Sequence, residues 1–379
     1  MQIAYEGLIY EMMPTGGIAR YFEELITHLP EDCNPHLLIP EAFRVKATHP
    51  NLKTHYAKVK PPFHSAFTKK LLARYWRKSR WGKIEASFAG ISADVRHWTY
   101  YCGLCQRPIP RSQIPNVITV YDFIAEHHPE IDPRGKHRQW LQQATTVADH
   151  VICISETTHN ELCNRYPSAA EKTSIIPLGN SFKEIESAEL PEQLRNQDYL
   201  LFVGRRNEYK NFSVLWKAWK TVKTLYPGLL LAAAGPPVSD RECQTLAISR
   251  DESGFVPLGP VSDGTLKTLY AKSKAFVFPS RMEGFGLPAL EAMESGSIVL
   301  ASDCAALKEV CGDAARYFHP DDETRLAELI DWVMNLPVTE RLTAMQLGKR
   351  RASSFSWEQV AKKTTQVYQT VIANHSGTA

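Results

Sequence analysis

Residues 275–293 read AFVFPSRMEGFGLPALEAM, an apolar run followed by a glycine-rich loop and a helical pattern. The run from Ala275 to Phe278 lacks the apolar–polar alternation of a half-exposed strand, which indicates a strand covered on both faces. Pro288 stands where the first turn of a helix tolerates proline, so we expect a helix to begin near Gly286. A buried strand, a glycine loop and a helix in this order are typical of a parallel α/β sheet.

The same order of strand and helix recurs along the chain. Short apolar runs end in Gly, Pro, Asp or Ser, and each leads into a longer amphipathic stretch. This alternation predicts doubly wound α/β sheets, with parallel strands and helices on both faces. The runs are 117–120, 151–154, 199–203, 229–234, 275–278 and 298–301, with a further strand near 174–177.

The length of 379 residues suits two domains. The polar segment from Phe182 to Gln197, which contains Pro191, indicates the linker between them. We therefore predict a first domain over residues 1–185 and a second over residues 186–356. The last helical stretch, about 357–374, can pack across either domain, including back on the first.

Composition places the chain among soluble globular proteins. It carries 44 Lys and Arg against 41 Asp and Glu, a net charge of +3, with 44% hydrophobic and 22% charged residues. These values exclude disorder, collagen and coiled coil as the main structure. No run approaches the roughly eighteen apolar residues of a membrane span. The N-terminus lacks the basic and apolar regions of a secretory signal, so we expect a cytoplasmic protein.

Basic residues are concentrated between residues 42 and 84. This segment has twelve Lys and Arg and no Asp or Glu, which leaves the rest of the chain net negative. Apolar side chains recur there at helical spacing beside a basic face, a pattern that can lie on an anionic membrane surface. The alternative is a solvated helix packed on its own domain, and nucleic acid is disfavoured because no nucleic-acid motif accompanies the segment. The apolar stripe consists of Phe67, Leu71, Leu72, Tyr75 and Trp76.

Loops that follow strands are where a site is expected, because open parallel sheets bind ligands beyond the carboxyl ends of their strands. Gly16 and Gly17 precede a helical pattern, where the backbone can approach a ligand and the helix end can hold an anion. Arg205 and Lys210 follow the strand-end residue Gly204. A planar guanidinium and an ammonium group suit a diphosphate, with solvated surface charge as the alternative.

The loop after residue 278 gives the strongest signal. Gly284 and Gly286 leave room for phosphate oxygens at the start of the helix, whose free N–H groups and dipole favour an anion. Glu283 lies before that helix and Glu291 lies within it. Their carboxylates can accept hydrogen bonds from a hexose and a ribose, respectively.

The same loop also fits a dinucleotide-binding fingerprint. Gly284, Gly286 and Ala289 have the required spacing, and Asp303 follows about twenty residues later. This interpretation leaves the basic and acidic residues of the neighbouring loops unexplained. It also puts the fingerprint late in its domain instead of at the first strand–helix turn. A nicotinamide dehydrogenase is therefore the weaker alternative.

Several short stretches in both halves have a spacing shared with one enzyme family. Those of the second half are Gly204-Arg205, Lys210-Asn211, Gly259-Pro260-Val261-Ser262, Leu269-Tyr270-Ala271, Phe278-Pro279-Ser280, the E-x7-E pair Glu283 and Glu291, Glu309-Val310 and Ala314-Ala315. Those of the first half, which match more loosely, are Gly16 to Arg20, Val151 to Glu156 and Ile175 to Gly179. With these stretches the chain resembles the retaining glycosyltransferases of family 4, which have the GT-B fold.

The resemblance implies two Rossmann-like domains that face each other across a cleft, with the donor nucleotide on the second and the acceptor on the first. It assigns Arg205 and Lys210 to the donor diphosphate, Glu291 to the ribose and Glu283 to the donor sugar. Gly17 would close over the diphosphate from the first domain. The other donor contacts that it implies are Gly16, Gly204, Val261, Gly284, Phe285, Gly286 and Leu287.

One departure from the family lies after the strand at 117–120. Members commonly have His-Asp there, whereas this chain has Tyr121 and Asp122. We interpret Asp122 as a cleft residue near the acceptor or the donor sugar. His97, after another expected strand, either faces the cleft or is a core histidine. The candidate catalytic residues are therefore Asp122, Glu283, Arg205 and Lys210.

The expected reaction develops negative charge on a diphosphate leaving group. Many glycosyltransferases neutralise this charge with a metal held by a D-x-D motif, which this chain lacks. The C-x-x-C pair Cys102 and Cys105 has no second pair at zinc-site spacing, so we set structural zinc aside. Arg205, Lys210 and the helix N-terminus can stabilise the leaving group, and we predict a metal-independent enzyme without a cofactor.

We expect this enzyme to transfer a hexose from a nucleotide diphosphate sugar to a glycan or lipid-linked glycan in bacterial polysaccharide biosynthesis. Retention, which the family implies, would follow if the acceptor hydroxyl attacks from the face of the leaving group. A UDP-hexose such as UDP-glucose is the favoured donor because this donor class is common among such enzymes, and GDP-mannose is the alternative. A GT-B sugar epimerase and a nucleotide-sugar sensor without turnover are further alternatives.

Overall fold

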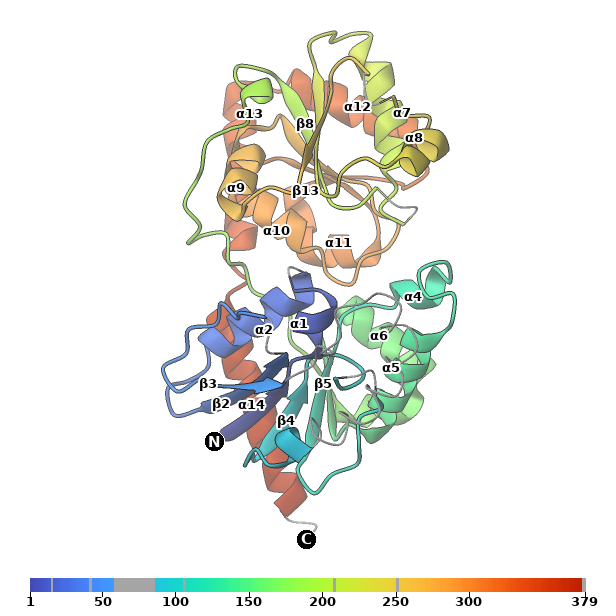
Figure 1. Ribbon diagram of the computed structural model, residues 1–379. Helices are drawn as coiled ribbons and strands as arrows, with labels where there is room; N and C mark the ends of the chain where they lie inside the picture. The colour runs from blue at the N-terminus through green and yellow to red at the C-terminus, as the bar shows by residue number, and fades with distance from the viewer. Residues whose placement is uncertain are drawn as a thin grey trace, which may run out of the picture. The chain divides into compact units, whose positions relative to one another are not determined.

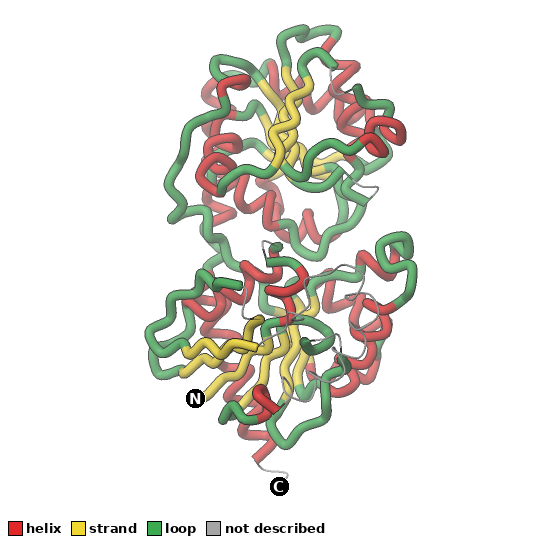
Figure 2. The backbone as a smooth tube through the Cα atoms, viewed as in Figure 1, coloured by secondary structure: helices red, strands yellow, loops and turns green. Residues whose placement is uncertain are grey.

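The computed structural model describes residues 1–14, 16–40, 43–57, 86–104, 107–206, 209–249 and 252–376. The chain forms two compact units, one of Met1–Gly179 with Trp357–Ala379 and one of Asn180–Ser356. Each unit contains one sheet covered by helices on both faces (Figures 1 and 2). The α/β class expected from the sequence is confirmed. The division falls a few residues before the boundary predicted at residue 185.

The sheet of the first unit has the strand order β3-β2-β1-β4-β5-β6-β7, and its strand pairings are parallel. The order reverses between β1 and β4, which is the topological switch point of a doubly wound sheet. The strands are β1 (Gln2–Glu6), β2 (Asn34–Pro40), β3 (Lys53–Ala57), β4 (Val95–Trp98), β5 (Asn116–Val120), β6 (His150–Cys153) and β7 (Thr173–Ile175). The helices are α1 (Leu8–Met12), α2 (Gly17–Thr27), α4 (Ile124–His127), α5 (Lys136–Val147), α6 (Glu156–Arg165), the 3-10 helix η1 (Pro167–Lys172) and α14 (Trp357–Ser376).

The second unit has the strand order β10-β9-β8-β11-β12-β13, again with parallel pairings. Its switch point lies between β8 and β11. The strands are β8 (Tyr199–Val203), β9 (Leu230–Ala234), β10 (Phe255–Gly259), β11 (Ala275–Phe278), β12 (Val299–Ser302) and β13 (Ala315–Phe318). The helices are η2 (Glu192–Leu194), α7 (Phe212–Lys223), α8 (Asp240–Leu246), α9 (Asp263–Lys272), α10 (Leu287–Glu294), α11 (Ala305–Cys311), η3 (Gly312–Ala314), α12 (Glu323–Met334) and α13 (Val338–Ala352).

The core of the second unit shows why these segments fold as they do. The strands β8 and β11 are apolar along their whole length and almost entirely buried, as expected for strands covered on both faces. Helix α7 buries Phe212, Trp216 and Trp219 on one side, while Lys217 and Lys220 stay at the surface. Phe212 meets Phe202 of β8 edge to face, with ring centroids 4.9 Å apart. Burial of such rings stabilises the unit by about 2–3 kcal/mol each.

Helix α14 belongs to the first unit, where it packs on α2 and β4 (Figure 1). A side chain on Gly179 would lie 2.5 Å from the ring of Trp357, so this close approach needs glycine. Further along, the hydroxyl of Tyr368 lies 2.6 Å from Nδ1 of His97 in β4. These contacts hold the end of the chain on the first unit.

Two expectations fall on residues outside the described ranges. The amphipathic pattern with Phe67 and Trp76 lies in residues 58–85, so the helix there stays a prediction. Cys105, one half of the C-x-x-C pair, also lies outside them, while Cys102 is a buried free thiol. Among the helices that the structure describes, none combines the length and the apolar character that a membrane span requires.

Candidate functional site

The loops after β8 and β11 meet at the switch point of the second unit. The backbone N–H of Arg281 donates to the carbonyl of Tyr209 at 2.7 Å, and the Asn211 side-chain amide donates to the carbonyl of Pro279 at 3.2 Å. Asn211 is buried and has a left-handed backbone with φ 52°. The two loops, which were predicted as separate candidate regions, therefore lie side by side and are joined by hydrogen bonds.

This junction joins two predicted site residues directly. Nζ of Lys210 donates to Oε1 of Glu283 at 2.6 Å, with the side chains 15% and 10% exposed. Nζ also lies 5.2 Å from the centre of the Phe278 ring and 5.3 Å from that of Tyr209. A partly buried cation with a carboxylate and two aromatic faces around it is held in a defined position.

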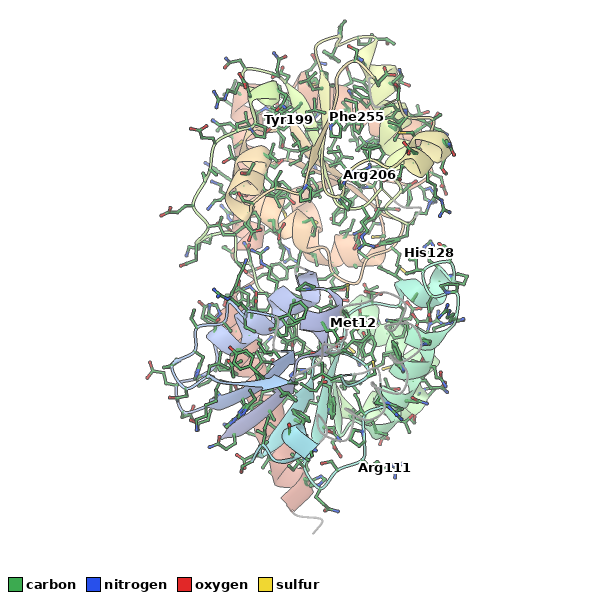
Figure 3. All side chains as sticks on the ribbon, viewed as in Figure 1. Met12, Arg111, His128, Tyr199, Arg206 and Phe255 are labelled. Carbon is green, nitrogen blue, oxygen red and sulfur yellow. The ribbon has the colours of Figure 1, made fainter. Side chains whose placement is uncertain are left out.

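The two arginines after β8 occupy different environments. Arg205 is exposed at the end of the strand. Arg206, labelled in Figure 3, is buried, donates to the carbonyl of Pro236 at 2.6 Å and lies 3.0 Å from the carboxylate of Glu242. Arg206 therefore ties this loop to the segment after β9, which leaves Arg205 as the guanidinium open to a ligand.

Helix α10 begins where the sequence predicted. Gly286 is its N-cap, with φ +114°, and Pro288 lies in its first turn. A Cβ on Gly286 would come within 2.6 Å of Leu307, so both the backbone conformation and the space require glycine. Inside the helix, the carboxylate of Glu291 accepts a hydrogen bond from the Tyr270 hydroxyl at 3.3 Å.

The other predicted donor contacts of the second unit follow β8, β10 and β11. Gly204 has φ +130° and follows β8 directly, with open space where a side chain would be. Gly284 and Phe285 are buried between β11 and α10, and the Phe285 ring packs edge to face on Phe355. Val261, before α9, and Leu287, the first residue of α10, are both half-buried.

In the first unit, Gly16 and Gly17 begin α2 as expected. Gly16 is the N-cap of the helix, and Gly17 is exposed, with nothing within 4 Å of an added Cβ. Asp122 follows β5, is half-buried and accepts the backbone N–H of Ile124 at 2.9 Å. Its neighbour Tyr121 points into the core, where its ring contacts Tyr21 and Tyr101.

The expectation that His97 faces a cleft is wrong. His97 lies within β4 and is fully buried, with Nε2 2.9 Å from the hydroxyl oxygen of Thr119 and Nδ1 against Tyr368. Burial lowers its pKa to about 3, so the ring is neutral. It is a core histidine, the second of the two interpretations.

Sequence reasoning missed a buried acid at the first unit's switch point. Glu6 is the last residue of β1, and its carboxyl oxygens accept the backbone N–H groups of Leu8 and Leu104. Burial raises the pKa of Glu6 to about 8. The signal that could have found it is an acid that directly ends the first apolar run of the chain.

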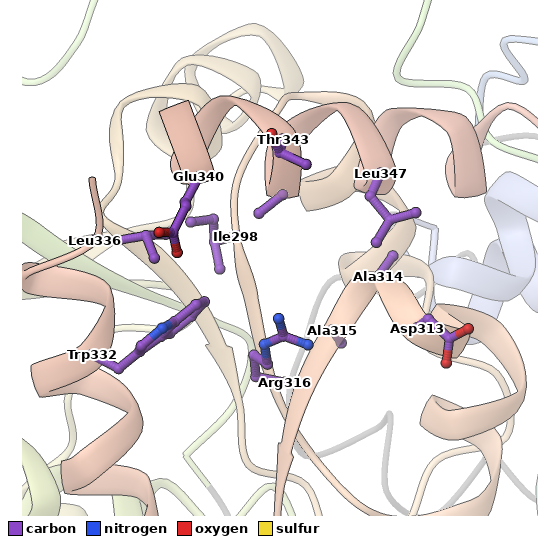
Figure 4. Close-up of a pocket in the computed structure, with 11 residues that line it drawn as sticks. Ile298, Asp313, Ala314, Ala315, Arg316, Trp332, Leu336, Glu340, Thr343 and Leu347 are labelled. Carbon is purple, nitrogen blue, oxygen red and sulfur yellow. The ribbon is translucent and has the colours of Figure 1, made fainter. Parts of the chain in front are cut away.

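The second unit also has a hollow of about 230 Å³, and none of these residues is among those that line it (Figure 4). It opens at the amino ends of β12 and β13, where Ile298 and Ala315 line it, and Arg316 lies over the ring of Trp332 at 5.3 Å. The candidate residues lie at the carboxyl ends of the strands, which is where doubly wound sheets bind ligands. We therefore assign the site to the loops and not to this hollow.

Both halves of the chain match known glycosyltransferase families. Residues 184–351 match the model described as "Glycosyl transferases group 1", and residues 15–180 match the model described as "Glycosyltransferase Family 4". The "O-antigen chain mannosyltransferase B" of Escherichia coli is 30% identical over 268 residues, which cover 67% of this chain and 70% of that protein. The chain belongs to glycosyltransferase family 4.

Solved structures show that this glycosyltransferase has the GT-B fold. Sucrose-phosphate synthase from Thermosynechococcus elongatus matches with a TM-score of 0.75 and 19% identity, covering 99% of this chain and 100% of that chain. Alr3699/HepE from Anabaena, solved in complex with UDP and glucose, matches with a TM-score of 0.66 and 17% identity, covering 96% and 98%. At these identities the likeness concerns the fold alone.

Proposed function

We propose that this glycosyltransferase moves a hexose from a nucleotide diphosphate sugar to a glycan or lipid-linked glycan acceptor in bacterial polysaccharide biosynthesis, with retention and without a metal. The observation that carries the proposal is the junction of the loops after β8 and β11, which pairs Lys210 with Glu283 at the switch point. The O-antigen mannosyltransferase of Escherichia coli supports the polysaccharide part.

The leaving group determines the roles that we assign. When the bond between the anomeric carbon and the diphosphate breaks, the sugar gains oxocarbenium character and the diphosphate gains negative charge. Arg205 and Lys210 would stabilise this charge together with the N–H groups that begin α10. Glu283 would accept hydrogen bonds from the hexose, and Glu291 would accept them from the ribose.

Retention would follow from attack on the same face as the departing diphosphate. The acceptor oxygen forms its bond to the anomeric carbon as the bond to the diphosphate oxygen breaks, and a phosphate oxygen takes the acceptor's proton. This route needs no carboxylate as a covalent nucleophile. Asp122, in the first unit, is proposed to lie near the acceptor or the donor sugar.

Two donors are compatible with these residues. A UDP-hexose such as UDP-glucose is our first choice, and the complex of Alr3699/HepE with UDP-glucose is an example of such a donor on the same fold. GDP-mannose is the second choice, because the Escherichia coli relative is a mannosyltransferase. The carboxylates and cations of the site can contact the ribose, diphosphate and hexose of either.

A panel of UDP, GDP, ADP and their sugars tests the proposal by calorimetry in the presence of a chelator. We expect one nucleotide sugar to bind and, with radiolabel in its hexose, to lose label to a glycan acceptor. Arg205→Ala, Lys210→Ala and Glu291→Ala should each weaken binding of that donor by about tenfold or more. Glu323→Gln, an exposed carboxylate on α12, is the control. Binding that appears only when a divalent metal is added would contradict the metal-independent part.

A further inference from the structure

The first unit contains a buried polar pair that the donor chemistry does not use. Glu126 lies in α4 with its side chain 3% exposed, and neither carboxylate oxygen has a hydrogen-bond partner among the described residues. Nδ1 of His137, in the first turn of α5, lies 3.7 Å from Oε1 of Glu126 and is likewise buried without a partner in the described part. An unmade hydrogen bond of this kind costs about 1–3 kcal/mol, so a buried pair without partners is a candidate for contact with a ligand.

The pair lies beside the strand end that carries Asp122. Asp122 accepts the N–H of Ile124, the first residue of α4, and α4 contains Glu126. The ring of His137 meets those of Tyr100 and Tyr101 edge to face, with centroids 5.9 Å and 5.2 Å apart. Burial and then the charge of Asp122 raise the pKa of both tyrosines, with Glu126 adding to the shift. The two carboxylates and the imidazole therefore share one cluster.

We propose that His137 binds a hydroxyl group of the acceptor sugar through Nε2 and that Glu126 is its positioning residue. His137 is 18% exposed while its Nδ1 is buried, so the exposed part belongs to the rest of the ring, where Nε2 lies. With the proton on Nδ1 directed at Glu126, Nε2 keeps the lone pair that accepts a hydrogen bond from a hydroxyl. The inference rests on the proposed hexosyl transfer and names the acceptor side of that reaction.

The surrounding charges favour a neutral, hydroxyl-rich acceptor group over an anion at this point. Asp122, Glu126 and Asp132 are acids, and after burial, the largest cause, all three raise the pKa of Tyr100. Arg138 lies 4.0 Å from the carboxylate of Asp132 and is paired with it. The N-terminus of α5 is already satisfied, because the carboxylate of Asp132 accepts the N–H groups of Lys136 and Arg138 at 2.9 Å and 3.3 Å. A phosphate would therefore meet acids here and no free helix end.

Two simple hexosides, methyl α-D-mannopyranoside and methyl α-D-glucopyranoside, serve as acceptor probes for the full chain. We expect at least one of them to accelerate release of nucleotide from the donor. It should also protect His137 of the wild type from diethyl pyrocarbonate, read at that residue by peptide mass spectrometry. His137→Gln and Glu126→Gln should raise the half-saturating hexoside concentration by about tenfold. The donor KM and the donor hydrolysis without hexoside should stay within about twofold of the wild type.

Matched controls come from the same unit. His159→Gln changes another histidine whose Nδ1 is buried without a partner within the described ranges, and Glu130→Gln changes an exposed carboxylate near α4. Both should keep the wild-type half-saturating concentration. Should Glu126→Gln fail to fold, His137→Gln and the protection measurement on the wild type still decide the question.

Either of two results overturns the inference. The first is a hexoside that is used as acceptor with unchanged half-saturation in both variants. The second is that neither hexoside accelerates turnover or protects His137. Donor hydrolysis by the wild type separates this failure from failure of the proposed function, because hydrolysis requires the donor site and no acceptor.

Discussion

Nζ of Lys210 and Oε1 of Glu283 form a 2.6 Å ion pair that links the loop after β8 to the loop after β11. Lys210 is the proposed partner of the donor diphosphate, and Glu283 is the proposed partner of the donor sugar. The two side chains therefore neutralise each other when no donor is bound. Both side chains are mostly buried, so the loss of either charge leaves the other poorly compensated. Under the proposed roles, an incoming diphosphate displaces Glu283 from Lys210, which frees the carboxylate for the hexose.

Glu283→Gln separates these two roles. Removal of the carboxylate charge should make the free nucleoside diphosphate bind more tightly, by about tenfold, because a like charge no longer stands near it and Lys210 has no competing partner. Transfer of the hexose should fall, because the sugar loses a charged hydrogen-bond acceptor. Calorimetry with the diphosphate and turnover with the intact donor measure the two effects. Weaker diphosphate binding in this variant would show that Glu283 does not compete for Lys210.

Arg205 and Arg206 are neighbours with opposite expected phenotypes. Arg206→Ala should destabilise the second unit by about 2–3 kcal/mol, because the carbonyl of Pro236 and the carboxylate of Glu242 lose a charged partner. For a unit of this size we expect a Tm lower by about 5–8 °C. Arg205→Ala should leave Tm unchanged and weaken donor binding. Thermal unfolding with and without nucleotide measures the stability and the nucleotide binding of each variant. A lower Tm in Arg205→Ala and weaker nucleotide binding in Arg206→Ala would exchange the two assignments.

Most of the fold could be predicted from the central strands. The runs at 199–203 and 275–278 have the bounds of β8 and β11, because a strand buried on both faces must be apolar throughout. The outer strand β3 could not be found in this way. It is an edge strand, its sequence Lys53 to Ala57 is mostly polar, and most of it is half-exposed or exposed.

The candidate site was predictable where residues lie close in sequence and not where the fold brings them together. The N-cap Gly286 and the first-turn Pro288 could be located from their local pattern. The contact of Lys210 with Glu283 spans 73 residues and depends on which strands are neighbours at the switch point. Arg205 and Arg206 cannot be told apart by type, because only the packing against Pro236 decides which is buried.

The basic segment gives a membrane prediction from sequence alone. Changing Lys69, Lys70, Arg74, Arg77 and Lys78 to Glu should release the protein from vesicles that contain phosphatidylglycerol, since each Lys or Arg near an anionic surface contributes about 1 kcal/mol. Vesicle sedimentation measures the bound fraction, with pure phosphatidylcholine as the uncharged comparison. Changing Lys217 and Lys220 of α7 to Glu is the control and should leave binding unchanged. If the variant with all five substitutions binds vesicles as well as the wild type, the result would favour a helix packed on its own domain.

His97 predicts how the first unit responds to acid. Burial lowers its pKa from 6.5 to about 3, so between these values the unfolded chain takes up a proton that the folded unit does not. The contribution of neutral His97 to the free energy of unfolding is fully present above about pH 6.5. It is lost as the pH falls toward 3, at about 1.4 kcal/mol per pH unit. Hydrogen exchange of peptides from β4 between pH 7.5 and 4.5 measures the opening free energy.

His97→Gln should lower this opening free energy at pH 7.5, because the fit to Thr119 and Tyr368 changes. The opening free energy of this variant should also change less steeply with pH, by the equivalent of about one bound proton, since Gln does not titrate. His36, His55 and His150, whose pKa values burial also lowers, account for slope that remains. His319→Gln, an exposed histidine of the second unit, should leave the slope in β4 unchanged. An unchanged slope in His97→Gln would mean that the acid sensitivity of β4 comes from other groups.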